Sequence, residues 1–196
     1  MLSGEPFLPD TAQLVGERDF CSQALFRFNT AKSSRCNTAE PSVSHRRGLS
    51  FEPIVAAWWI YPRVGERQVT GYLGHGVNVS APFHCDYGYN LSIGDDVAIG
   101  PSCQLLDSGR IAIGRNTKIG ARVTISTLEK PTGTRPLKAS ERTETACEVC
   151  IAENVYIGDG CIIEAGVCIG GNAINIPANC VASGNPARAR QVDWES

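Results

Sequence analysis

A six-residue repeat of aliphatic residues is the feature of this sequence that most limits its fold. The aliphatic positions, spaced six apart within each run, are Ile93, Ile99, Leu105, Ile113, Ile119, Ile125, Ile151, Ile157, Ile163 and Ile169. Glycine follows most of them, and the fourth residue after nearly all of them is small or β-branched. A period of six with frequent glycine is incompatible with stable helices and predicts short strands joined by turns.

About three such units close one triangular coil, so the repeat predicts an all-β solenoid. We expect the aliphatic column to stack in the interior and the small residues, including Cys103 and Cys161, to pack at the corners. We attribute the glycines to the backbone freedom that a turn requires. The repeat shifts by two residues after Leu105, and an inserted polar loop over 126–148 interrupts it.

The chain before the repeat has a different texture, so we expect an N-terminal segment, 1–76, and a β-helix, 77–196. Residues 16–29 show the apolar spacing of a helix. An apolar block at 53–62, bounded by prolines, predicts a short buried helix or an aromatic lining of a pocket.

Composition excludes several function classes. The 196 residues carry a net charge of −2 and show no basic face, so no nucleic-acid partner is expected. No run approaches the roughly 20 apolar residues of a membrane helix. The first ten residues lack the basic start and apolar core of a signal peptide, so we expect a cytoplasmic protein.

Nine cysteines are many for that compartment, but their odd number and spacing indicate no disulfide framework. Cys147 and Cys150 have the spacing of metal ligands. A structural zinc site needs four ligands, and no second pair accompanies these two, so no metal site is expected.

Three segments beside the repeat resemble the hexapeptide-repeat acetyltransferases, closest to the maltose, galactoside and nodulation-factor group. They are LSGEPFLPDTAQLVGER (2–18), APFHCDYGYNLSIGDD (81–96) and ASGNPARARQV (182–192). The resemblance implies a left-handed parallel β-helix and a homotrimer with active sites between subunits. It also implies acetyl-CoA along the coils and a loop histidine that deprotonates the acceptor hydroxyl.

The sequence departs from this family at the base. Lys130 stands before Pro131, where the family has histidine, and no histidine follows His84. A lysine near its ordinary pKa of about 10.4 is protonated at neutral pH and cannot act as a base. Gly100 or Ser102 occupies the region of a family asparagine, and about nine residues that help form the CoA groove seem absent before Pro186. These departures indicate changed chemistry.

The candidate site residues come partly from the family match and partly from the apolar block. Asp107 matches an acidic position at the end of a coil, and the segment 86–90 matches one that faces the acceptor. The catalytic candidates are Asp86, Asp107, Lys130 and His84. The substrate-binding candidates are Tyr87, Tyr89, Asn90, Ser102, Trp58, Trp59 and Tyr61.

Three hypotheses of function follow. The leading one is an enzyme repurposed for CoA-independent cyclisation or isomerisation of a hydrophobic natural-product intermediate, with no cofactor. The second is a divergent acetyl-CoA-dependent O-acetyltransferase that uses Lys130, His84 or an acid as its base. The third is a non-catalytic trimeric binding protein.

Overall fold

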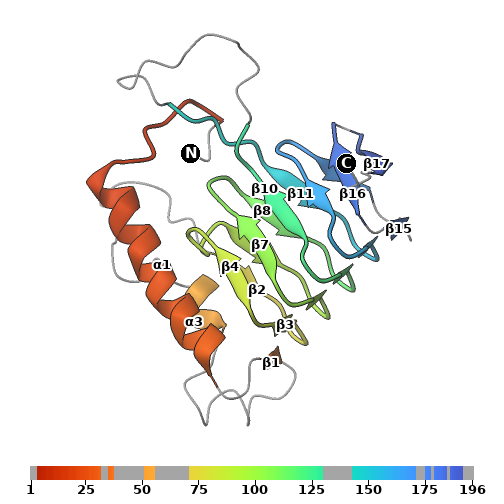
Figure 1. Cartoon of the computed structure of the whole chain (residues 1–196), viewed down its shortest axis with the longest axis horizontal. Coiled ribbons are helices and arrows are strands. Elements are labelled where there is room, and N and C mark those ends of the chain that lie inside the picture. The colour runs from red at the N-terminus through yellow and green to blue at the C-terminus, as the bar shows by residue number, and fades with distance from the viewer. Residues whose placement is uncertain are drawn as a thin grey trace, which may run out of the picture.

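The protein is a three-sided parallel β-helix with one long helix along its first coils (Figure 1). The computed structural model describes residues 4–31, 35–37, 51–55, 71–129, 143–170, 175–177, 179–184 and 186–191. The predicted left-handed parallel β-helix with an N-terminal helical segment is confirmed.

Three sheets form the sides of the coil. Their strands pair in parallel with the strand one coil away, except that β1 pairs antiparallel with β3 and β17 pairs antiparallel with β16. The first sheet contains β1 (Arg35–Asn37), β3 (Asn78–Ser80), β6 (Ala98–Ile99), β9 (Lys118–Ile119), β12 (Tyr156–Ile157) and β15 (Asn175–Ile176). The second contains β4 (Phe83–Cys85), β7 (Cys103–Leu106), β10 (Thr124–Ser126), β13 (Ile162–Ile163), β16 (Cys180–Ser183) and β17 (Arg188–Gln191). The third contains β2 (Tyr72–Leu73), β5 (Leu91–Ile93), β8 (Ile111–Ile113), β11 (Val149–Ile151) and β14 (Cys168–Ile169).

The aliphatic column stacks in register through the interior, as predicted. In the third sheet, Ile113 lies opposite Ile93 on one side and Ile151 on the other. All the aliphatic positions of the repeat are buried, and so are Cys103 and Cys161 of the small column. The core therefore runs the length of the coil, and each side chain packs on its equivalents in the neighbouring coils.

The glycines after the aliphatic residues have a different cause from the one expected. A Cβ atom at Gly94 would lie 2.8 Å from the backbone nitrogen of Arg115, and one at Gly100 would lie 2.7 Å from the carbonyl carbon of Gly120. The left-handed backbone occurs two residues later, with φ of 56° at Asp96 and 62° at Ser102. These glycines are therefore required by the close approach of the next coil rather than by their own φ.

Helix α1 (Ala12–Thr30) is longer than the predicted 16–29 and covers the open edge of the second sheet. Cys21 of this helix is fully buried, and Leu25 and Phe28 are nearly so. The Asn29 amide exchanges two 2.9 Å hydrogen bonds with the backbone of Phe83 on β4, which satisfies polar groups of an edge strand. Within the described ranges, no helix has both the length and the apolar character needed to span a membrane.

The apolar block begins as a short helix, α3 (Glu52–Val55), which carries the buried Ile54 and Val55. The start of the block thus fits the buried-helix alternative. Trp58, Trp59 and Tyr61 lie outside the described residues.

The coil continues beyond Gly170. Strands β15 and β16 pair in parallel with β12 and β13, and β17 folds back antiparallel on β16. The described residues after Gly170 therefore add two more sides of a coil and a hairpin.

Candidate functional site

The repeats depart from six residues at one corner of the coil, where the second sheet leads into the third. Ile93 comes eight positions after Cys85, and Ile113 comes eight positions after Leu105, instead of six. The next equivalent corner holds the inserted loop. The extra residues of successive coils stack on one another. We call residues 86–90, 107–109 and 127–129 the polar corner.

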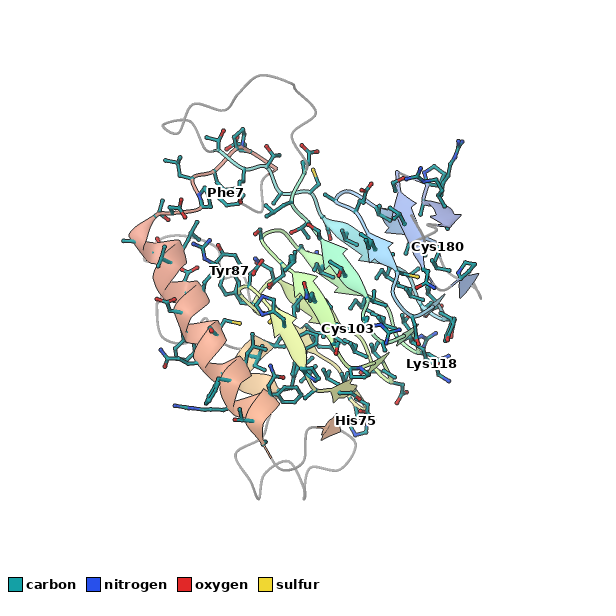
Figure 2. All side chains as sticks on the ribbon, in the orientation of Figure 1. Phe7, His75, Tyr87, Cys103, Lys118 and Cys180 are labelled. Carbon is teal, nitrogen blue, oxygen red and sulfur yellow. The ribbon has the colours of Figure 1, made fainter. Side chains whose placement is uncertain are left out.

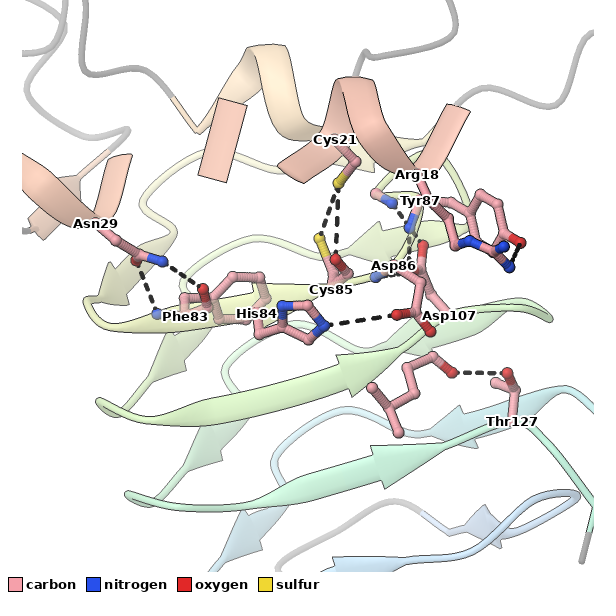
Figure 3. Close-up of polar contacts among 12 residues, drawn as sticks. Arg18, Cys21, Asn29, Phe83, His84, Cys85, Asp86, Tyr87, Asp107 and Thr127 are labelled. Atoms are coloured by element: carbon pink, nitrogen blue, oxygen red, sulfur yellow. Dashed lines mark hydrogen bonds and ion pairs between the residues drawn. The ribbon is translucent and has the colours of Figure 1, made fainter. Parts of the chain in front are cut away.

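Asp107 is the buried centre of the polar corner. One carboxylate oxygen accepts 2.9 Å hydrogen bonds from the backbone N–H groups of Asp86 and Tyr87, and the other accepts one of 2.8 Å from Gly88 (Figure 3). Burial raises the pKa of Asp107 to about 7, and these three donors oppose the rise. The carboxylate therefore fixes the backbone of the preceding coil, which carries the candidate residues.

The loop over 86–90 is also fixed from the other side by α3. Gly88 has φ of +77°, and a Cβ atom there would lie 2.0 Å from the carbonyl oxygen of Ile54. Only glycine fits this conformation and this contact.

Thr127 repeats the arrangement one coil later. Its hydroxyl donates to the carbonyl of Leu106 at 2.8 Å and accepts from the N–H of Gly109 at 2.8 Å. Side chains of two successive coils thus replace the strand hydrogen bonds that the longer corners interrupt.

Two tyrosines join the polar corner to α1. The Tyr87 hydroxyl accepts a 3.2 Å hydrogen bond from Arg18, and the Tyr89 hydroxyl donates one of 2.5 Å to Glu17. Burial raises the pKa of Tyr87, whereas the Arg18 charge lowers it. Glu17 and Arg18 could not be predicted as site residues, because nothing in a helical segment indicates which side chains meet a loop about 70 residues away.

His84 and Asp86 form an accessible pair at the start of the polar corner. The imidazole Nε2 lies 3.5 Å from Asp86 Oδ1, and the two side chains are 54% and 24% exposed (Figure 3). The hydrogen bond to Asp86 raises the pKa of His84 above its ordinary value of 6.5, although partial burial lowers it. The pair is therefore an imidazole in contact with solvent and oriented by a carboxylate.

Both ends of the inserted loop reach this corner. Leu128 bridges Ala146, and Glu144 pairs with Phe7 of the N-terminal segment through two 2.9 Å backbone hydrogen bonds. Figure 2 shows Phe7 and Tyr87 on the side of the coil that faces α1. The N-terminal segment and both ends of the loop thus lie beside the polar corner.

The structure brings six of the predicted site residues together and separates another. The six are His84, Asp86, Tyr87, Tyr89, Asn90 and Asp107. Ser102 lies at the other end of β7 from Asp107. Lys130 lies outside the described residues.

Asn90 carries a buried polar atom without a partner. Its amide nitrogen donates to the Asp107 carbonyl at 2.6 Å, while its Oδ1 atom accepts no hydrogen bond from the described part of the chain. In that same part, no group of three potential ligands could hold a metal ion.

Comparisons with known proteins identify relatives over almost the whole chain. Residues 1–48 match the family model of the maltose acetyltransferase hexapeptide capping motif. Nodulation protein L of Rhizobium meliloti (strain 1021) is 34% identical over 142 residues, which cover 68% of this chain and 74% of that protein.

Solved structures agree with these relatives. The maltose O-acetyltransferase from Clostridium difficile 630 is 31% identical, with a TM-score of 0.68 over 99% of this chain and 95% of that one. A galactoside acetyltransferase in complex with coenzyme A shares the fold, with 23% identity and a TM-score of 0.69 over 97% and 88% of the two chains.

These likenesses favour the acetyltransferase alternative and lend no support to the expected CoA-independent cyclisation or isomerisation. Three findings lead to one assignment. They are the parallel β-helix, the match of the N-terminal residues to a capping motif, and the 31% identity to a maltose O-acetyltransferase over 99% of the chain. The chain belongs to the hexapeptide-repeat acetyltransferase family.

Proposed function

We propose that the protein transfers the acetyl group of acetyl-CoA to a hydroxyl group of a small acceptor. The observation that carries this proposal is the 31% identity to a maltose O-acetyltransferase across 99% of the chain. The polar corner supports it, because the ends of the inserted loop and the N-terminal segment meet there beside residues 86–90, which match the family segment that faces the acceptor.

The exposed basic residues of the C-terminal hairpin fit the phosphate groups of CoA. Arg188 and Arg190 are exposed and two apart on β17, so they share one face. Guanidinium groups suit phosphate because they donate two parallel hydrogen bonds. β17 is five strands from β4 across the second sheet, or about 24 Å at about 4.8 Å per strand, a span that extended CoA can cover. We assign these two arginines to the phosphates.

The acceptor belongs at the polar corner. Tyr87 and Tyr89 supply aromatic faces, and the buried Asn90 Oδ1 atom offers an acceptor that a substrate hydroxyl would satisfy. A buried polar group without a hydrogen bond costs about 1–3 kcal/mol, so filling this acceptor would favour a hydroxylated ligand. A homotrimer with sites between subunits, as the family resemblance implies, is part of this proposal.

The chemistry needs an activated acyl group, which acetyl-CoA supplies as a thioester. The protein must bind both substrates, exclude water and remove the acceptor proton. Asp107 contributes by holding the backbone on which Asp86, Tyr87 and Gly88 lie.

An acetyl-transfer assay tests the proposal. The purified protein is incubated with acetyl-CoA and either maltose or a galactoside, and acetylated sugar is detected by mass spectrometry. We expect a time-dependent gain of one acetyl group on at least one sugar, or CoA release that depends on another hydroxylated acceptor. Acetyl-CoA that remains intact with every hydroxylated acceptor tried would contradict the proposal.

A charge variant tests the phosphate assignment. Replacing both Arg188 and Arg190 with glutamine should raise the Kd for CoA about tenfold or more, because charge-assisted hydrogen bonds to phosphate are lost. Arg27→Gln, an exposed arginine on α1, is the matched control and should leave the Kd unchanged. Equal Kd values in the double variant and the wild type would remove these arginines from the site.

A further inference from the structure

The family base position falls at Lys130, and a protonated lysine cannot accept the acceptor proton. Among the described residues in the polar corner and on the strands that lead into it, His84 is the one side chain that ordinarily titrates near neutral pH. His75 lies at a different corner of the coil, well away from Tyr87 (Figure 2).

We propose that His84 is the general base of the transfer, that Asp86 orients it, and that Asp107 is a positioning residue that acts through the Asp86 backbone. This inference rests on the proposed acetyltransferase function. It places the base on strand β4 rather than on the inserted loop.

The geometry defines which nitrogen reacts. Asp86 Oδ1 lies 3.5 Å from His84 Nε2, so the neutral imidazole keeps its proton on Nε2 and leaves the Nδ1 lone pair free. The side chain of His84 is 54% exposed, so a substrate can reach it. A base that a carboxylate orients in this way is the arrangement that nucleophile activation generally uses.

Asp107 connects the pair to the core. Its carboxylate holds the N–H of Asp86 at 2.9 Å, and it is itself fully buried. The position of the Asp86 side chain therefore depends on a backbone that the next coil fixes.

The charges around His84 favour a base that works near neutral pH. Asp86 and Asp107 both raise the pKa of the imidazole. On β7, the neighbour in register is the neutral Gln104. From α1, Cys21 and Asn29 contact β4, while Glu17 and Arg18 lie on the tyrosines.

The reaction step balances with these groups. His84 Nδ1 takes the proton of the acceptor hydroxyl as its oxygen attacks the acetyl carbonyl carbon. The new carbon–oxygen bond forms, the carbon–sulfur bond breaks, and the CoA thiolate takes the proton back from the imidazolium. The products are an acetyl ester and CoA, and His84 is neutral again.

The test compares His84→Gln with His75→Gln, an exposed histidine whose side chain is away from the polar corner. With an acceptor that the wild type acetylates, H84Q should lower kcat about a hundredfold or more, because general-base catalysis contributes that much. The Kd for acetyl-CoA and the thermal unfolding midpoint should stay near those of the wild type, and H75Q should be unaffected. H84Q with kcat within twofold of the wild type would overturn the inference and leave the acetyltransferase function standing.

Asp86→Asn gives a readout that a merely structural role would not change. NMR titration should show the His84 pKa above 6.5 in the wild type and lower in D86N, and the acidic limb of the kcat profile should shift the same way. An unchanged His84 pKa would remove Asp86 as the orienting group. A wild type that neither binds acetyl-CoA nor releases CoA would overturn the proposed function and the inference together, which distinguishes that failure from an active H84Q.

Discussion

The regular sides of the coil and the polar corner both stack on the neighbouring coils, but different interactions hold the coils together in the two regions. On the sides, identical aliphatic residues meet in register, as Ile99 and Ile119 do on β6 and β9. At the corner, Asp107 and Thr127 bond to the backbone of adjacent coils. The sides need only the hydrophobic effect and strand pairing, whereas the corner needs side chains of particular polarity at particular atoms. A corner held in this way can present polar groups to a substrate.

The largest expected effect is on the aliphatic column. Leu105→Ala should lower the free energy of unfolding by about 3 kcal/mol, because a fully buried leucine leaves a cavity among close-packed neighbours. Its exposed neighbour on β7, Gln104, is the control, and Gln104→Ala should stay within about 0.5 kcal/mol. Chemical denaturation followed by circular dichroism measures both. Equal losses of unfolding free energy in the two variants would mean that burial of the aliphatic column does not stabilise this side of the coil.

The next effect separates the corner from the sides. Below pH 3.8, Asp107→Asn should cost about 2 kcal/mol, because both oxygens of the carboxyl group can accept a backbone N–H and the amide nitrogen of asparagine cannot. Asp19→Asn on the exposed face of α1 is the matched control. A D107N protein as stable as the wild type would show that the corner does not depend on this carboxylate.

The pH dependence of stability sharpens the same point. The folded pKa of Asp107 is about 7, above its ordinary value of 3.8, so the folded state binds this proton more tightly than the unfolded state. The stability that the tighter binding of this proton gives the folded state is fully present below pH 3.8 and is lost as the pH rises toward 7. The difference in unfolding free energy between the wild type and D107N should therefore shrink over this range. A difference that grows with pH would mean that the three backbone donors outweigh burial.

The smallest effect concerns the second coil of the corner. Thr127→Val keeps the shape but removes the hydroxyl that bonds Leu106 and Gly109, and it should cost about 1–2 kcal/mol. Thr124→Val on the outer face of β10, where valine suits a strand, is the control. A T127V protein as stable as the wild type would show that, of these two side chains, only Asp107 stabilises the polar corner.

The repeat could be predicted from the sequence because it depends on contacts between equivalent residues at a fixed period. The column from Ile93 to Ile169 is visible without knowledge of any tertiary contact. The glycine positions were visible too, but their cause was not, since the approach of Arg115 to Gly94 exists only once the coils are stacked.

The site was only partly predictable, for a different physical reason. The family match indicated the segment over 86–90, but it could not show that the Asp107 side chain accepts hydrogen bonds from the backbone of that segment. Nor could helical spacing show that Arg18 and Glu17 meet the tyrosines, because the direction of each side chain is set by how α1 docks on β4.

The leading functional hypothesis placed too much weight on the missing loop histidine. Loss of a base from one position does not abolish the reaction if another side chain can take the proton. We propose that His84, which lies on strand β4 rather than on the inserted loop, is such a group, with Asp86 directly after the strand as its partner.

Calorimetric titration of the purified protein with acetyl-CoA, and in parallel with CoA, tests whether the protein binds an acetyl donor. We expect a single class of sites with micromolar affinity for both ligands. An absence of binding up to millimolar concentration would contradict the proposed function, because an acetyltransferase must hold its donor.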